Sequence, residues 1–166
     1  MTTAKELIEK LRLERHPEGG WFRETWRCGA GFEPGEAWGG RRSAGTAIYY
    51  LLTPDTYSAM HRLPGDEVFH FYLGDPVEML ELLPDGRGRV TVLGAGLDGM
   101  RPQHVVPGGV WQGSRLRAGG AWALLGTTMS PGFAYEDYEH GGPELVTRYP
   151  EHGDLVRALL PGGAPP

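Results

Sequence analysis

Short apolar segments alternate with turns rich in glycine and proline along most of the chain. Within the segments, apolar and polar side chains often alternate, which is the pattern of a strand with two different faces. The turn between residues 83 and 88 carries Asp85-Gly86, a strong hairpin signal. Regularly spaced short strands of this kind are typical of a sandwich or a barrel. Strands are predicted over residues 21–26, 44–53, 57–63, 67–73, 77–83, 88–93, 103–106, 110–116 and 121–128.

Helical patterns occur only near the two ends of the chain. Thr3 and Glu6 are spaced as a capping box, and a helix that begins there should stop before Pro17. Leucine spacing in residues 144–160 predicts a second helix. We therefore expect one mainly β domain over residues 1–160, followed by a disordered tail over residues 161–166, which contains only glycine, alanine and proline.

Two segments between the regular elements are expected to act as loops. Residues 28–43 are rich in glycine and are predicted to form a mobile loop. Residues 130–138 are aromatic and acidic, and they are interpreted as a flap at the mouth of a barrel. Phe133 and Tyr135 in this flap are candidate ligand contacts.

Composition excludes several classes of function. The chain has 166 residues and a formal net charge of −5, with no basic run, which argues against a nucleic-acid or anionic-membrane partner. Cys28 is the single cysteine, so neither an internal disulfide nor a cysteine zinc cluster is possible. The start resembles no signal peptide, and no apolar run is long enough to span a membrane. A cytoplasmic protein is expected.

The strongest chemical signal lies in residues 57–73. Two strands flank the turn Pro64-Gly65-Asp66, and they are predicted to pair with each other. His61 and Glu67 would then point into the same space from an otherwise apolar face. Buried polar groups of this kind are costly unless they are hydrogen-bonded or used, so the pair is either functional or a satisfied structural pair.

The same residues allow two kinds of chemistry. A catalytic metal site normally has three protein ligands. Leu63 cannot bind a metal and Gln112 is a poor ligand, so His61 and Glu67 are the two good ligands. No cofactor is therefore expected. The alternative is weak binding of a divalent metal by His61, Glu67 and Gln112. Proton transfer needs only a histidine held beside a carboxylate. His61 is therefore the predicted base and Glu67 its orienting partner.

Other polar side chains have either a binding or a structural interpretation. Arg23 or Glu24, on the first strand, could line a pocket or form an ion pair at the surface. Gln112 and Ser114 share one face of their strand, where Gln112 could orient a ligand or hydrogen-bond a neighbouring strand. The remaining histidines are assigned no catalytic role: His70 should face outward, His104 should lie at the surface, and His16, His140 and His152 fall in polar loops.

Two strings relate the chain to a known family. The first cupin motif, G-x5-H-x-H-x3-4-E-x6-G, corresponds to His61-x-Leu63, Glu67 and Gly74, and the second corresponds to Pro107-Gly-Gly109 with Gln112. The chain thus resembles a cupin in which Leu63 replaces the second histidine and Gln112 replaces the last. It is more specifically similar to the cupin subfamily described as DUF985 or cupin-5. The similar strings are HPEGGW at 16–21, RET at 23–25, TAIYYLL at 46–52, HR at 61–62, DE at 66–67, HFY at 70–72, GDP at 74–76, PQ at 102–103, VP at 106–107, WQ at 111–112 and PGF at 131–133.

This resemblance implies a double-stranded β-helix, or jelly-roll barrel, with a pocket inside and usually a homodimer. It implies no settled activity. Metal-free relatives include sugar-nucleotide epimerases with a histidine base and a tyrosine acid, which would make Tyr50 or Tyr135 the candidate acid by analogy of fold.

Three hypotheses remain open from the sequence. The first is an isomerase- or epimerase-like enzyme that acts on a sugar nucleotide or another polar metabolite by proton transfer. The second is a non-catalytic binding or sensing protein with the same pocket. The third is a weakly metal-dependent enzyme.

Overall fold

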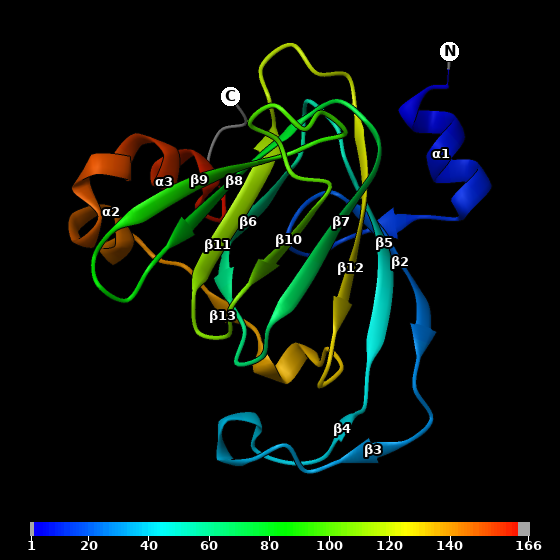
Figure 1. Ribbon diagram of the computed structural model, residues 1–166, viewed down its shortest axis with the longest axis vertical. Coiled ribbons are helices and arrows are strands. Elements are labelled where there is room, and N and C mark those ends of the chain that lie inside the picture. Colours follow the sequence, from blue (N-terminus) through cyan, green and yellow to red (C-terminus); the bar gives the residue numbers. More distant parts are fainter. Residues whose placement is uncertain (1, 163–166) are drawn as a thin grey trace.

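The computed structural model describes residues 2–162 and shows a barrel formed by two facing antiparallel sheets (Figure 1). The first sheet has the strand order β1 (Glu14–Arg15), β2 (Trp21–Arg27), β5 (Thr46–Leu52), β12 (Ala123–Met129), β7 (Glu67–Gly74) and β10 (Gln103–Val106). The second has the order β13 (Glu139–His140), β6 (Tyr57–Arg62), β11 (Trp111–Leu116), β8 (Val77–Leu82) and β9 (Gly88–Leu93). This is the mainly β architecture predicted from the strand spacing, and it is the jelly-roll barrel that the family resemblance implies. The tail predicted over residues 161–166 lies mostly outside the described residues.

Three apolar clusters hold the layers together. The main core fills the space between the two sheets and includes Leu52, Met79 and Leu125, none of which is exposed. A second cluster joins the outside of the five-stranded sheet to α2 (Glu144–Arg148) and α3 (Gly153–Leu159) (Figure 1). A third packs α1 (Ala4–Leu11) against β5 and β12. Helices therefore cover the barrel from outside and leave its interior to side chains of the strands.

The predictions for the helices are partly confirmed. Thr3 and Glu6 form the expected capping box at the start of α1, which ends at Leu11, well before Pro17. The single C-terminal helix predicted over residues 144–160 is instead two helices with a 3-10 turn, Pro150–His152, between them. Pro150 explains the break, because a proline lacks the N–H that a continuous helix requires. No helix among the described residues is long and apolar enough to cross a membrane.

The predicted pairing of residues 57–63 with residues 67–73 is wrong. β6 pairs with β11 and β13 in one sheet, whereas β7 pairs with β12 and β10 in the other. The turn between them crosses from sheet to sheet, and Asp66 Oδ1 accepts a hydrogen bond of 2.8 Å from Gly108 N in the neighbouring turn. β6 and β7 therefore face each other across the barrel.

A bulge in β6 changes which side chains point inward. Gln112 pairs with His61 and Ser114 pairs with Ser58, so three steps along β6 match two steps along β11. An extra residue of this kind reverses the alternation of faces. Ser58 and His61 both face the interior as a result, while Met60 packs against the C-terminal helices. The simple alternation used on the sequence could not place Ser58.

The segment 28–43, predicted as a loop, contains a short hairpin of β3 (Gly31–Phe32) and β4 (Arg42–Ser43) around the 3-10 turn η1 (Glu36–Trp38). Figure 1 shows this hairpin projecting beyond one end of the barrel. Its last strand carries a buried arginine, Arg42, that is tied to the flap described below.

Candidate functional site

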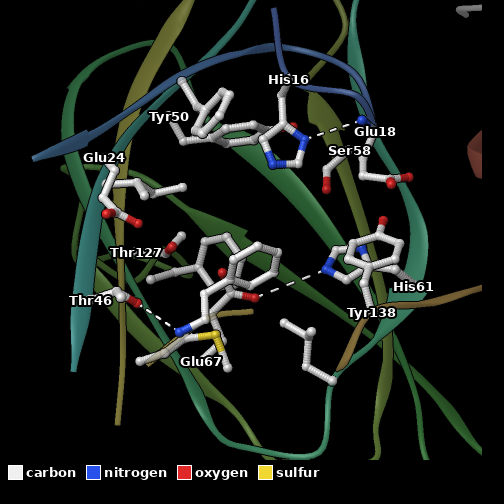
Figure 2. A pocket seen from close by; sticks show the side chains of 16 residues that line it. His16, Glu18, Glu24, Thr46, Tyr50, Ser58, His61, Glu67, Thr127 and Tyr138 are labelled. Carbon is white, nitrogen blue, oxygen red and sulfur yellow. Dashed lines mark hydrogen bonds and ion pairs between the residues drawn. The ribbon is translucent and has the colours of Figure 1, made fainter. Parts of the chain in front are cut away.

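A cavity of about 70 Å³ lies inside the barrel, between the two sheets and beneath residues 130–140, which we call the flap (Figure 2). The flap contains the 3-10 turn η2 (Tyr135–Asp137) and β13. The cavity is lined by His16, Glu18, Phe22, Glu24, Thr46, Ile48, Tyr50, Ser58, His61, Leu63, Glu67, Phe69, Thr127, Met129, Phe133 and Tyr138.

His61 presents a hydrogen-bond acceptor to this cavity. Its side chain is buried, and its Nδ1 lies 2.7 Å from the carbonyl oxygen of Ala59, so Nδ1 must carry the proton. The other ring nitrogen, Nε2, then has a free lone pair. Burial lowers the pKa of His61 to about 4, and the imidazole is consequently neutral at physiological pH.

Glu67 faces His61 from the opposite sheet. Its Oε2 lies 4.0 Å from His61 Nε2 and accepts a hydrogen bond of 2.8 Å from Gln112 Nε2. Burial raises the pKa of Glu67 to about 7, and Thr127 and Gln112 offset that effect only in part. The carboxyl group therefore gains and loses its proton in the neutral range. The orienting partner of His61 is the Ala59 carbonyl, and Glu67 is the group that titrates.

The loop before β2 adds a half-buried histidine and a buried carboxylate. His16 Nδ1 accepts a hydrogen bond of 3.1 Å from Glu18 N, so neutral His16 carries its proton on Nε2. Burial lowers the pKa of His16 to about 4. His16 and His61 are thus neutral in opposite tautomers, one a donor and the other an acceptor.

This loop is held in place by backbone contacts. Gly19 has a φ of 104°, and a Cβ at this position would lie 2.0 Å from the carbonyl oxygen of Tyr57. The Gly19 carbonyl accepts a hydrogen bond of 2.8 Å from Tyr50 Oη, and Glu18 O accepts one of 3.1 Å from Ala59 N. Sequence reasoning assigned no role to His16 or Glu18; the only signal for them was their place in the string HPEGGW.

Tyr138 of the flap covers His61. The two rings are stacked, with centroids 4.7 Å apart and planes inclined by 14° (Figure 2). The Tyr138 hydroxyl is buried, and within the described range 2–162 it has no partner with hydrogen-bond geometry. Burial and the charge of Glu18 both raise the pKa of this phenol, which therefore stays protonated. Tyr138, rather than Tyr50 or Tyr135, is the tyrosine that contacts the predicted base.

An ion pair fixes the flap to the hairpin. Arg42 Nε and Nη2 donate to the Asp137 carboxylate at 2.8 and 2.6 Å, and both side chains are almost fully buried. Arg42 Nη2 also donates to the carbonyl oxygen of Trp38. A bidentate arginine–carboxylate pair is geometrically specific, so this contact determines where the flap lies over the cavity.

The predicted ligand-binding residues fall into different positions. Glu24, Tyr50 and Phe133 line the cavity. Arg23 does not: it points away from the barrel interior, where its guanidinium lies 5.7 Å from the ring of Tyr49. Tyr135 is half exposed and donates a hydrogen bond of 3.3 Å to Glu18 Oε1 from the outer part of the flap.

Gln112 does not line the cavity and contacts the site through its hydrogen bond to Glu67. Ser114 does not line the cavity either, and its buried hydroxyl has no hydrogen-bond partner among the described residues. His70 lies on the outer side as predicted, where its Nε2 is 3.0 Å from Thr128 Oγ1. His104 was predicted at the surface, but it is buried, and its Nε2 lies 2.9 Å from Glu81 Oε2. The strand alternation of β10 turns His104 inward together with Val106.

The donor set does not fit a tightly held metal. Among the described residues, no group of three or more histidine, cysteine, aspartate or glutamate side chains could hold an ion. His61 and Glu67 supply two ligands, Leu63 none, and the amide nitrogen of Gln112 is directed at Glu67. No step of the chemistry below is routed through a metal.

Comparisons with known proteins agree with the geometry. The family described as "Cupin superfamily (DUF985)" matches residues 5–141. The uncharacterized protein YML079W of Saccharomyces cerevisiae is 30% identical over 149 residues, which cover 82% of this chain and 74% of the yeast protein. A hypothetical protein from Leishmania major has a similar structure, with a TM-score of 0.86, 35% identity and coverage of 96% of this chain and 99% of that one.

A more distant similarity concerns the fold alone. Bacillus subtilis oxalate decarboxylase superimposes with a TM-score of 0.53 and 14% identity, over 90% of this chain and 37% of the decarboxylase.

Proposed function

The chain belongs to the cupin superfamily, in the DUF985 family, and we propose that it binds a small polar molecule in its barrel and exchanges a proton with it. The observation that carries this proposal is the pairing of two buried groups, one with a raised pKa, Glu67, and one with a lowered pKa, His61. Glu67, with a pKa near 7, can both give and take a proton at physiological pH, while neutral His61 offers a lone pair 4.0 Å away. A general acid or base works best when its pKa lies near the working pH.

The roles follow from the hydrogen bonds. His61 is fixed by Ala59 and accepts a hydrogen bond from the ligand, which holds the ligand beside Glu67. Glu67 transfers the proton, and Gln112 keeps its carboxyl group in position. Tyr138, whose phenol stays protonated, supplies a donor from above. An isomerase- or epimerase-like reaction is the class that requires only such proton movement.

The test uses solvent deuterium as a label. The small-molecule fraction of a cell extract is incubated with the protein in D₂O, and mass spectrometry identifies compounds that gain deuterium. We expect at least one compound to exchange with the wild type, and exchange to fall at least 100-fold with Glu67→Gln. His61→Asn should weaken binding as well as exchange. Absence of any compound that exchanges faster with the wild type than with Glu67→Gln would refute the catalytic proposal.

A second candidate function is binding without turnover. It is favoured by the closed flap, since Tyr138 and Phe133 cover a cavity of only about 70 Å³. A compound that survives ultrafiltration with the protein, and that never exchanges or changes, would support this function. Elemental analysis of the same sample tests the metal-dependent alternative, because stoichiometric metal would contradict a metal-free site.

We also propose a homodimer that uses the outside of the six-stranded sheet. Tyr72 of β7 and Val105 of β10 are 46% and 43% exposed there. A second copy of the chain packed against this face would bury both apolar side chains. Sedimentation should show a dimer for the wild type and a monomer for Tyr72→Glu. A monomeric wild type would contradict the proposal.

A further inference from the structure

The cavity that we assign to ligand binding has an unusual charge balance. Of the described residues, three carboxylic acids line it, Glu18, Glu24 and Glu67, and no lysine or arginine does. The two histidines in the lining are held neutral by burial. A ligand that enters this space therefore meets negative charge without a compensating cation.

The three carboxylates are not equally compensated from outside. Glu24 is paired at the rim with Arg27, at 2.9 and 2.7 Å, so most of its charge is neutralised. Glu18 is buried, and its basic neighbour is His140, whose Nδ1 lies 3.4 Å from Glu18 Oε2. His140 balances the charge of Glu18 only when the imidazole is protonated. In the part of the chain that the structure describes, the basic side chain paired with Glu67 is neutral His61 alone. Glu18 and Glu67 are thus the two acids left to interact with a ligand.

Aromatic rings form the rest of the wall. Phe22, Tyr50, Phe69, Phe133 and Tyr138 line the cavity together with the ring of His16, which packs edge-to-face on Phe22 at 4.6 Å. The faces of aromatic rings attract cations, and more strongly where water is excluded. An aromatic wall combined with buried carboxylates suits an ammonium group and is unfavourable for a carboxylate or a phosphate.

The hydrogen-bonding groups specify a second feature of the ligand. His61 Nε2 is a buried acceptor without a hydrogen-bonded partner, so it requires a donor such as an N–H or O–H. Figure 2 shows His61 and Glu24 on opposite sides of the cavity, with Glu67 below and His16 above. A molecule with an ammonium group and a hydroxyl group can satisfy acceptors on several sides at once.

Size limits the ligand further. One buried water needs roughly 10–15 Å³ of cavity volume. A ligand atom needs a similar share, so the cavity of about 70 Å³ holds on the order of five non-hydrogen atoms. A sugar nucleotide is far larger, and its diphosphate would have no cation to bind. The sugar-nucleotide ligand suggested by resemblance is therefore disfavoured by the charge and the volume of the cavity.

We infer that this cavity, taken as the binding site proposed above, selects small organic cations, in particular primary amines that also carry a hydroxyl group. This inference rests on the proposed binding function and narrows its ligand class. Because a bound cation stabilises ionised Glu67, binding should also release protons near pH 6, where most of Glu67 is protonated.

Three probes of nearly equal size separate the possibilities: ethanolamine, its uncharged analogue propan-1-ol, and the anion glycolate. Dissociation constants are measured by NMR at pH 8 and low salt, where Glu67 is ionised. We expect ethanolamine to bind at least tenfold more tightly than propan-1-ol, and glycolate not to bind. At pH 6, calorimetry in buffers of different ionisation enthalpy should detect proton release with ethanolamine alone.

Variants identify the source of the selectivity. Glu18→Gln and Glu67→Gln should each reduce the preference for ethanolamine to less than about threefold. Glu78→Gln is the matched control, because Glu78 pairs with Arg115 and Arg117 outside the cavity and should leave the preference unchanged. Thermal unfolding of each variant shows whether it is folded.

The outcomes separate this inference from the proposed function. Equal binding of ethanolamine and propan-1-ol, tighter binding of glycolate, or no binding of any probe would overturn the inference. None of these results would affect deuterium exchange into another compound, which tests the proposed function by itself. Loss of exchange together with retained cation selectivity would instead refute catalysis and leave the ligand class standing.

Discussion

His61 and Glu67 belong to opposite sheets of the barrel and meet across its interior, with Nε2 and Oε2 4.0 Å apart. Neither residue owes its position to the other, since Ala59 holds His61 and Gln112 holds Glu67. Because the two supports are independent, a ligand atom can hydrogen-bond with both side chains while the hydrogen bonds to Ala59 and from Gln112 stay in place.

Glu67→Gln should make the protein more stable at high pH relative to the wild type. The folded pKa of Glu67 is about 7, above its ordinary value of 4.5, so the unfolded chain loses this proton first as pH rises. In the wild type, the contribution of Glu67 to the free energy of unfolding is fully present below about pH 4.5 and is lost as pH rises to about 7. Urea unfolding at a series of pH values should show the difference between the two proteins growing by at most about 3 kcal/mol across that range. A constant difference would show that the carboxyl group is not perturbed.

His16 and His61 should produce the opposite dependence at acid pH. Both have folded pKa values of about 4, below the ordinary value of 6.5, so the unfolded chain takes up protons first as pH falls. Their contribution is present above about pH 6.5 and is lost as pH falls to about 4, by up to about 3 kcal/mol for each residue. NMR titration of the imidazole resonances measures the two pKa values directly. Values near 6.5 would contradict the buried neutral histidines.

Arg89→Ala should be much more destabilising than Arg87→Ala. Arg89 donates two hydrogen bonds, of 3.0 and 2.7 Å, to Glu81, which is completely buried. Burial alone would raise the pKa of Glu81, but hydrogen bonds from His104 and Arg89 lower it to about 2, so this carboxylate is charged. Removing one partner of a buried charge costs about 3–5 kcal/mol, and the half-exposed Arg89 should fall at the lower end. Arg87 pairs with Asp85 at the surface, where solvent screens the two charges, so its loss should change stability far less. Equal effects in urea unfolding would contradict the network.

Arg42→Ala should release the flap. Its guanidinium binds Asp137 in a bidentate pair with both side chains buried, and its loss leaves Asp137 without that partner. Hydrogen exchange measured by mass spectrometry should then increase at least tenfold in residues 130–140, while the strands of the main core change little. Arg41→Ala is the control, because Arg41 contributes only its backbone carbonyl to this cluster. Unchanged exchange in the flap of the Arg42 variant would show that the flap is held by its aromatic contacts instead.

The amino-acid sequence alone determined the strands of four or more residues, the capping box at Thr3 and the family, but not the two-residue strands β1, β3, β4 and β13. Local periodicity and turn chemistry encode these features, and both are readable without knowing which strands are neighbours. The same signals selected His61 and Glu67, because polar side chains at inward positions stand out against an apolar face.

The tertiary structure decided how those residues meet. A turn of three residues does not reveal whether it closes a hairpin or crosses between sheets, so the opposed positions of His61 and Glu67 could not be predicted. The bulge that turns Ser58 inward depends on pairing with β11, where the nearest pair, His61 and Gln112, is separated by 51 residues in the chain. His16, Glu18 and Tyr138 reach the cavity from a loop and a flap that have no periodicity to interpret. Their burial, and with it the altered pKa values of His16 and Tyr138, exists only when distant segments pack around them.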